Sequence, residues 1–128
     1  MHLKIIIALF TLLFCLQIPV FAQALPEKQA FFEVLPALPL MEGLKEHKES
    51  TFIFDKPDGQ IVEVEVSSAT LSYENILDFY AASLPQLGWK KISKNQFAKK
   101  NEILIFVSEN AQAQSPSGTT LKVILLPR

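Results

Sequence analysis

Two glutamates in one short stretch are the first residues whose spacing suggests catalysis. In residues 60–67, Glu63 and Glu65 alternate with valines, which is the period-2 pattern of a strand with one buried face. The two carboxylates then lie on the same side, about 7 Å apart along the backbone, a separation that would suit a pair acting on a glycosidic bond. Outward acids on a strand are also ordinary solvation, and no other residue marks a sugar site, so we assign both glutamates to a solvated face.

Three further side chains are potential metal ligands. Asp55 and Asp58 flank a turn, but a calcium loop of the helix-loop-helix kind needs more oxygen ligands and a final glutamate, which are missing here. His47 is the one histidine after His2, and it has no cysteine or second histidine with which to share a metal. We therefore expect no metal and no cofactor.

Covalent catalysis has little support in the sequence. The single cysteine, Cys15, belongs to the N-terminal apolar run, and no G-x-S-x-G motif is present. A serine–histidine–acid site built on His47 stays open, because such residues meet in space rather than in sequence order. In the absence of a visible catalytic constellation, we expect a protein that is not an enzyme.

A lysine-rich stretch is the candidate contact for anions. Residues 89–100 combine two aromatic residues with five lysines, which are Lys90, Lys91, Lys94, Lys99 and Lys100. This composition occurs on surfaces that bind single-stranded nucleic acid or anionic lipid, and also where solvated lysines protect the edge of a sheet. We keep a contact with anionic lipid headgroups or envelope polymers as a hypothesis.

The first 24 residues have the features of a secretory signal peptide. Lys4 precedes an apolar run, and Ala22-Gln23-Ala24 is an A-x-A cleavage site. Cleavage after Ala24, or alternatively after Ala22, releases the chain into the periplasm or the medium, away from nucleic acids, which we exclude as partners. The alternative is retention as a membrane anchor, because the apolar run from Ile5 to Phe21 reaches the lower limit of a span.

After the leader we predict a single domain. Residues 25–48 form a proline-rich extended segment that packs on the domain, because Pro26, Pro36 and Pro39 prevent a long helix. Residues 49–128 form the domain itself. With no cysteine after Cys15, stability depends on the hydrophobic core rather than on disulfides.

The periodicity places one helix among several strands. Strands are predicted at 50–54 and 60–67, joined by a Lys-Pro-Asp-Gly turn. Ser72 can cap a helix that carries one apolar stripe and ends at Gly88, and short strand patterns follow between residues 89 and 126. The order β-β-α-β-β-β predicts an α+β two-layer sandwich, an antiparallel sheet of about five strands with one helix on one face.

Two phrases resemble a known group of proteins. The helix end Phe79–Trp89 reads F-Y-x-x-x-L-P-x-x-G-W and is similar to that of small exported bacterial domains and lipoproteins of unknown function. Several of these also contain a proline-rich phrase like Leu38–Leu44. The resemblance implies an exported module and brings no activity with it. The motif residues themselves indicate architecture, since the aromatics pack the helix and the glycine ends it.

The second face of the sheet is the candidate interaction surface. If Phe52, Phe54 and the valines of 62–66 face the helix, alternation sends four apolar side chains to the other face, which are Ile53, Ile61, Leu104 and Phe106. Such a face is too apolar for open water. Either residues 31–41 fold over it, which we expect, or a partner does.

We therefore predict a non-enzymatic extracytoplasmic module that docks on another envelope protein through this face or through a sheet edge. The alternative is a small-ligand or lipid-binding domain with a pocket between helix and sheet, lined by Tyr73, Tyr80 and Phe97. The oligomeric state is left open.

Overall fold

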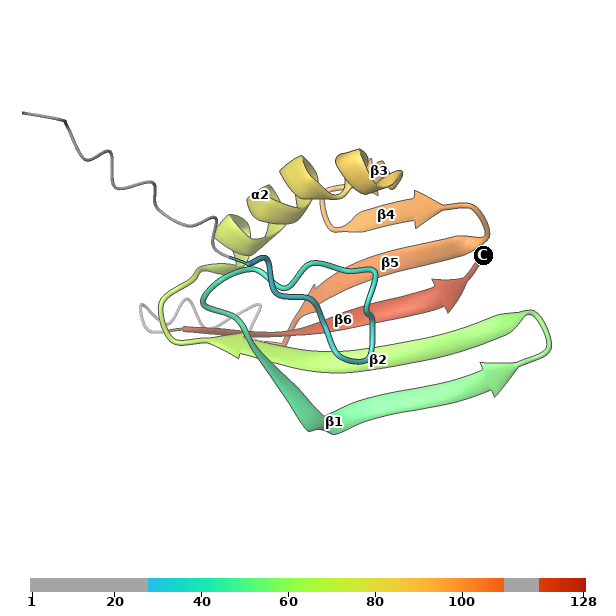
Figure 1. Cartoon of the computed structure of the whole chain (residues 1–128), viewed down its shortest axis with the longest axis horizontal. Helices are drawn as coiled ribbons and strands as arrows, with labels where there is room; N and C mark the ends of the chain where they lie inside the picture. The colour runs from blue at the N-terminus through green and yellow to red at the C-terminus, as the bar shows by residue number, and fades with distance from the viewer. Residues whose placement is uncertain (1–27, 110–117) are drawn as a thin grey trace, which may run out of the picture.

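The computed structural model describes residues 28–109 and 118–128. The predicted signal peptide, its cleavage sites at Ala22 and Ala24, and the tip of the last loop lie outside these residues. Within them, six strands form one sheet, and a helix covers part of one face (Figure 1). The predicted α+β fold is confirmed.

All neighbouring strands are antiparallel, in the order β1-β2-β6-β5-β4-β3. The sheet has six strands, close to the predicted number of about five. The strands are β1 (Lys45–Lys56), β2 (Gly59–Ser68), β3 (Lys90–Ser93), β4 (Gln96–Lys99), β5 (Glu102–Ser108) and β6 (Thr119–Pro127).

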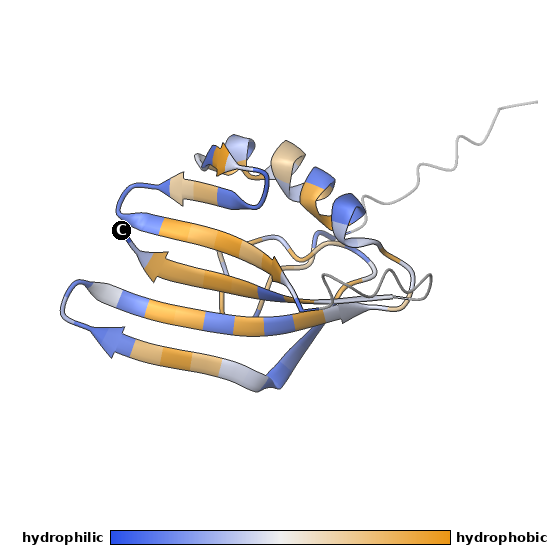
Figure 2. Ribbon diagram, turned by 180° about the vertical axis from the view of Figure 1, so that it is seen from behind, coloured by the Kyte–Doolittle hydropathy of each residue, from blue (hydrophilic) through white to orange (hydrophobic). Residues whose placement is uncertain are grey.

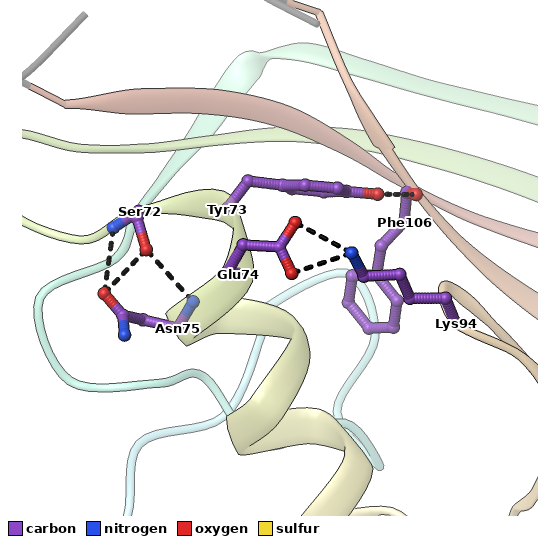
Figure 3. Close-up of polar contacts among 6 residues, drawn as sticks. All are labelled: Ser72, Tyr73, Glu74, Asn75, Lys94 and Phe106. Atoms are coloured by element: carbon purple, nitrogen blue, oxygen red, sulfur yellow. Dashed lines mark hydrogen bonds and ion pairs between the residues drawn. The ribbon is translucent and has the colours of Figure 1, made fainter. Parts of the chain in front are cut away.

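The helix α2 (Tyr73–Ser83) begins after a residue suited to cap it, Ser72, and ends before Leu84 and Pro85. The Ser72 hydroxyl accepts a hydrogen bond from the Asn75 backbone N–H at 3.1 Å, and the Asn75 side chain reaches back to the Ser72 amide, so two otherwise unpaired donors are satisfied (Figure 3). A 3₁₀ turn, η1 (Pro85–Leu87), follows, and Gly88 closes it with φ 87°. This left-handed conformation favours glycine.

One helix is too small to cover this sheet. The 11 residues of α2 make a rod about 16 Å long and about 10 Å wide, whereas six strands span about 24 Å. The uncovered part of the same face is filled by the proline-rich segment, which contributes four side chains to the core together with those of α2 and the sheet. These are Phe32, Leu35, Leu38 and Leu44.

Two sets of hydrogen bonds hold the proline-rich segment on the helix side. Glu46 lies opposite Val66 in the register, so its side chain shares the face of the buried valines. The Glu46 carboxylate accepts hydrogen bonds from the amides of Glu33 at 3.0 Å and Val34 at 3.5 Å. The buried Tyr80 hydroxyl donates to the Pro39 carbonyl at 2.9 Å. The expectation that this segment covers the other face is therefore wrong.

The Tyr80 hydroxyl gives the first testable prediction. Tyr80→Phe should lower the free energy of unfolding by about 1–3 kcal/mol, because it leaves the Pro39 carbonyl without its donor. Burial raises the pKa of Tyr80 above its usual value of 10.0. Its contribution is therefore complete below about pH 10 and is lost as the pH rises, since only the unfolded chain ionises readily.

Urea denaturation of both proteins at pH 8 and pH 11 measures this. The parent protein should lose more stability between the two pH values than Tyr80→Phe does. Equal losses would contradict the role assigned to burial, because Tyr80→Phe retains every lysine and the other tyrosine, whose titration affects both proteins alike.

Candidate interaction surface

The face of the sheet turned away from α2 carries a group of apolar side chains that nothing covers among residues 28–109 and 118–128. We call this the open face. Register fixes its members: Phe54 lies opposite Ile61, Ile105 opposite Ile124, and Ile103 opposite Leu126. Figure 2 shows the sheet from this side, with apolar residues running along β5 and β6. None of the eight is buried; they are Phe52, Phe54, Ile61, Ile103, Ile105, Val107, Ile124 and Leu126.

The sequence placed the wrong residues on this face in two strands. Leu104 and Phe106 were expected there but are buried in the core. Ile53 lies opposite the buried Val62 and so shares the helix side, although it is half exposed at the sheet edge. Of the four predicted residues, only Ile61 lies on the open face.

The physical reason is the absence of polar markers in β5. Residues 103–107 are all apolar, so alternation alone cannot decide which set faces the helix. Ring packing decides it, because Phe106 stacks on Tyr80 with ring centroids 4.5 Å apart and meets Phe97 edge-on at 6.0 Å. In β2 the glutamates do mark the outer face, and there the predicted burial of the valines is confirmed.

A polar rim borders the open face at one end. Lys122 Nζ lies 2.9 Å from Glu63 Oε1 and 3.2 Å from Glu109 Oε1. The hydrogen bonds that Lys122 donates to the Glu63 and Glu109 carboxylates raise the pKa of Lys122. Glu63 and Glu65 share the face as predicted, but Glu63 is occupied by Lys122, so the two are not a free pair of catalytic carboxylates.

The same rim contains a hydrogen-bonded trio that sequence order could not reveal. His47 Nε2 lies 2.6 Å from Ser67 Oγ, and His47 Nδ1 lies 3.4 Å from Glu49 Oε1. The pKa of Glu49 is lowered by its own backbone N–H and by His47. The hydrogen bonds thus connect a serine, a histidine and a carboxylate in the order found in a Ser-His-acid catalytic site.

This trio lacks the donors that acyl transfer requires. Ser67 lies within β2, between β1 and β6, where it is paired with Lys45 and Thr120, so its backbone belongs to the sheet ladder and is not available to stabilise an oxyanion. The Glu49 side chain is 77% exposed, so solvent competes for it. We assign the trio to the polar rim.

The five lysines of the hairpin do not form one patch. Glu74 holds Lys94 at 2.9 Å (Figure 3) and raises its pKa. Lys99 Nζ lies 5.9 Å from the centroid of the Trp89 ring. Lys90 lies opposite Ala98 and Lys91 opposite Phe97, so these two point to opposite faces; Lys100 is exposed in the next turn.

The rings proposed to line a pocket between helix and sheet instead fill that space. Tyr80 and Phe97 are fully buried against Phe106, and Tyr73 donates a hydrogen bond to the Phe106 carbonyl at 2.8 Å. An open groove of about 800 Å³ lies elsewhere, between residues 28–30 and 40–44 on one side and residues 70, 71 and 79 on the other.

The described residues contain no group of three or more His, Cys, Asp or Glu side chains arranged to hold a metal. No helix in this part of the chain is long and apolar enough to cross a membrane. Comparisons with known proteins give no match to a family model, to a curated protein or to a solved structure.

The assignment of faces in β5 can be tested by two truncations. Leu104→Ala should lower the free energy of unfolding by about 2–5 kcal/mol, because it leaves a cavity in the core. Val107→Ala, on the open face, should cost less than about 1 kcal/mol. Urea denaturation measures both. A larger loss for Val107→Ala than for Leu104→Ala would contradict the assignment.

Proposed function

We propose that this protein is a non-enzymatic, exported envelope module that docks on another protein through its open face. The observation that supports this most directly is the uncovered apolar strip, which crosses four neighbouring strands. Monomeric proteins rarely leave a contiguous apolar surface of this kind in water unless it binds something. An apolar centre with a polar rim is also the usual anatomy of a protein interface.

The charges around the open face are of both signs, which suits a protein as the occupant. Glu63, Glu65 and Glu109 lie on or beside the open face, where Lys122 is paired with two of them. The register places three further lysines on this side, which are Lys45, Lys56 and Lys90. Charges of both signs at the rim are typical of a protein interface, whereas a contact with anionic lipid depends on a cluster of basic residues without acids among them. A partner that places a second sheet or an apolar helix about 10 Å away would cover the strip.

Export is the second part of the proposal and rests on the N-terminal sequence. The chain purified from the medium or the periplasm of the expressing bacterium should begin at Leu25 and lack residues 1–24. Intact mass and N-terminal sequencing measure this. A product that begins at Met1 and sediments with membranes would instead support the retained anchor.

Docking through the open face can be tested by site-specific crosslinking in intact cells. A photoreactive amino acid replaces Ile105 in the full chain, and the matched control replaces Ala82, which is exposed on α2 on the opposite side of the molecule. We expect a defined crosslinked band from position 105 and none of that size from position 82.

A polar substitution on the open face then tests whether the crosslinked protein contacts its apolar side chains. Ile124→Gln, next to Ile105 in the register, should reduce the crosslink about fivefold or more, since a glutamine amide buried in an apolar contact without a partner costs about 1–3 kcal/mol. Equal bands from positions 105 and 82 would contradict the proposal, as would lipid adducts in place of protein.

A further inference from the structure

We infer that the outer edge of β1 pairs with the same edge of a second copy of this chain, antiparallel and centred on Ile53. This goes beyond the proposed function, because it involves a strand edge and a second copy rather than the open face and a different protein. The inference rests on a difference between the two edge strands in how well each is protected against pairing with another strand.

The sheet has two edge strands, and they are protected to different extents. At one end, β3 has 4 residues and carries Lys90 and Lys91, and a short, lysine-bearing strand is a common protection against unwanted pairing. At the other end, β1 has 12 residues, and its lysines lie outside the stretch Thr51–Asp55. An edge strand exposes the backbone N–H and C=O groups of every second residue, which are a template for another strand.

The exposed part of β1 is also unusually apolar. Phe52, Ile53 and Phe54 are consecutive and are 55%, 51% and 51% exposed. The two phenylalanine rings are stacked, with centroids 6.3 Å apart and planes 6° from parallel. Figure 1 shows this end of the β1–β2 hairpin projecting beyond both α2 and the proline-rich segment, so neither covers it.

The sequence of this edge is complementary to itself when it is reversed. With Ile53 opposite the partner's Ile53, Phe52 lies opposite the partner's Phe54, and apolar residues face apolar residues on both sides of the joined sheet. One step outward, Thr51 lies opposite the partner's Asp55. Beyond this pair Ser50 lies opposite the partner's Lys56, so no like charges face each other.

Thr51 adds an independent observation. Its hydroxyl oxygen is buried and has no hydrogen-bond partner among the described residues. A buried hydroxyl without a partner costs free energy. In the paired arrangement the partner's Asp55 supplies a carboxylate acceptor at cross-strand distance, within reach once the Thr51 side chain rotates.

The ladder between the two copies is short. The pairing of β1 with β2 is irregular between His47 and Phe52, and such a bulge ends the flat part of an edge. Pairing therefore extends from about Thr51 to Asp55. The phenylalanine rings of the two copies then lie side by side, so that the two open faces become continuous across the two-fold axis.

Light scattering coupled to size-exclusion chromatography of the full chain, as exported and purified, provides the first test. The parent protein should show a mass that rises toward that of a dimer with concentration. Ile53→Lys should stay at the mass of a single chain, because it places two lysines opposite each other. The control is Ile92→Lys on β3, at a residue with the similar exposure of 53%, which should leave the dimer intact.

Disulfide trapping provides the second test and also detects a weak dimer. In a full chain carrying Cys15→Ser, Ile53→Cys should form a covalent dimer on mild oxidation, because opposed residues of antiparallel strands are about 4.5–5.5 Å apart at Cα, within the range of a disulfide. Ile92→Cys should remain monomeric under the same oxidation.

Three results would overturn the inference. The first is a parent protein that stays monomeric at all concentrations together with an Ile53→Cys protein that does not crosslink. The second is a dimer that persists in Ile53→Lys, and the third is a dimer lost in Ile105→Lys but kept in Ile53→Lys, which would assign the contact to the open face. Because Ile53 lies on the helix side, the inference and the proposed function can fail separately.

Discussion

The fold depends on a mismatch in size between its two layers. A helix of 11 residues faces a sheet of six strands, so a second element must share the helix side if the valines of β2 are to be dry. The proline-rich segment fills that place, and the contacts of Tyr80 with Pro39 and of Glu46 with Glu33 hold it there. Because α2 and the proline-rich segment both pack on the helix side, no element among the described residues covers the open face.

This mismatch also explains which parts of the fold were visible in the sequence. Elements with local signals were predicted well: Ser72 and Gly88 mark the ends of the helical region, and Glu63 and Glu65 mark the outer face of β2. The side on which the proline-rich segment packs was not predictable, because its leucines fit any apolar surface. That choice is made by the Tyr80 hydroxyl, which is 41 positions from Pro39, and by the Glu46 carboxylate, which β1 places on the helix side.

The candidate site also combines features that local sequence signals predict with features that depend on distant contacts. Its apolar character was predicted, but most of its residues were not. In β5 and in the exposed end of β1, consecutive residues are apolar, so alternation does not show which side chains face the helix. In such strands the face is selected by packing between distant rings, here Phe106 against Tyr80 and Phe97. The contact between His47 and Ser67 likewise joins residues 20 positions apart, and only the register of β1 on β2 brings them together.

The open face and the edge of β1 are chemically one region, because Phe52 and Phe54 belong to both. A two-fold axis through Ile53 perpendicular to the sheet would join two apolar strips end to end and reverse the direction of the second. The glutamate rims of the two copies would then lie at diagonally opposite corners, which keeps their negative charges apart. The joined surface would present the same strip twice in opposite directions, and a partner that is itself two-fold symmetric matches such an arrangement best.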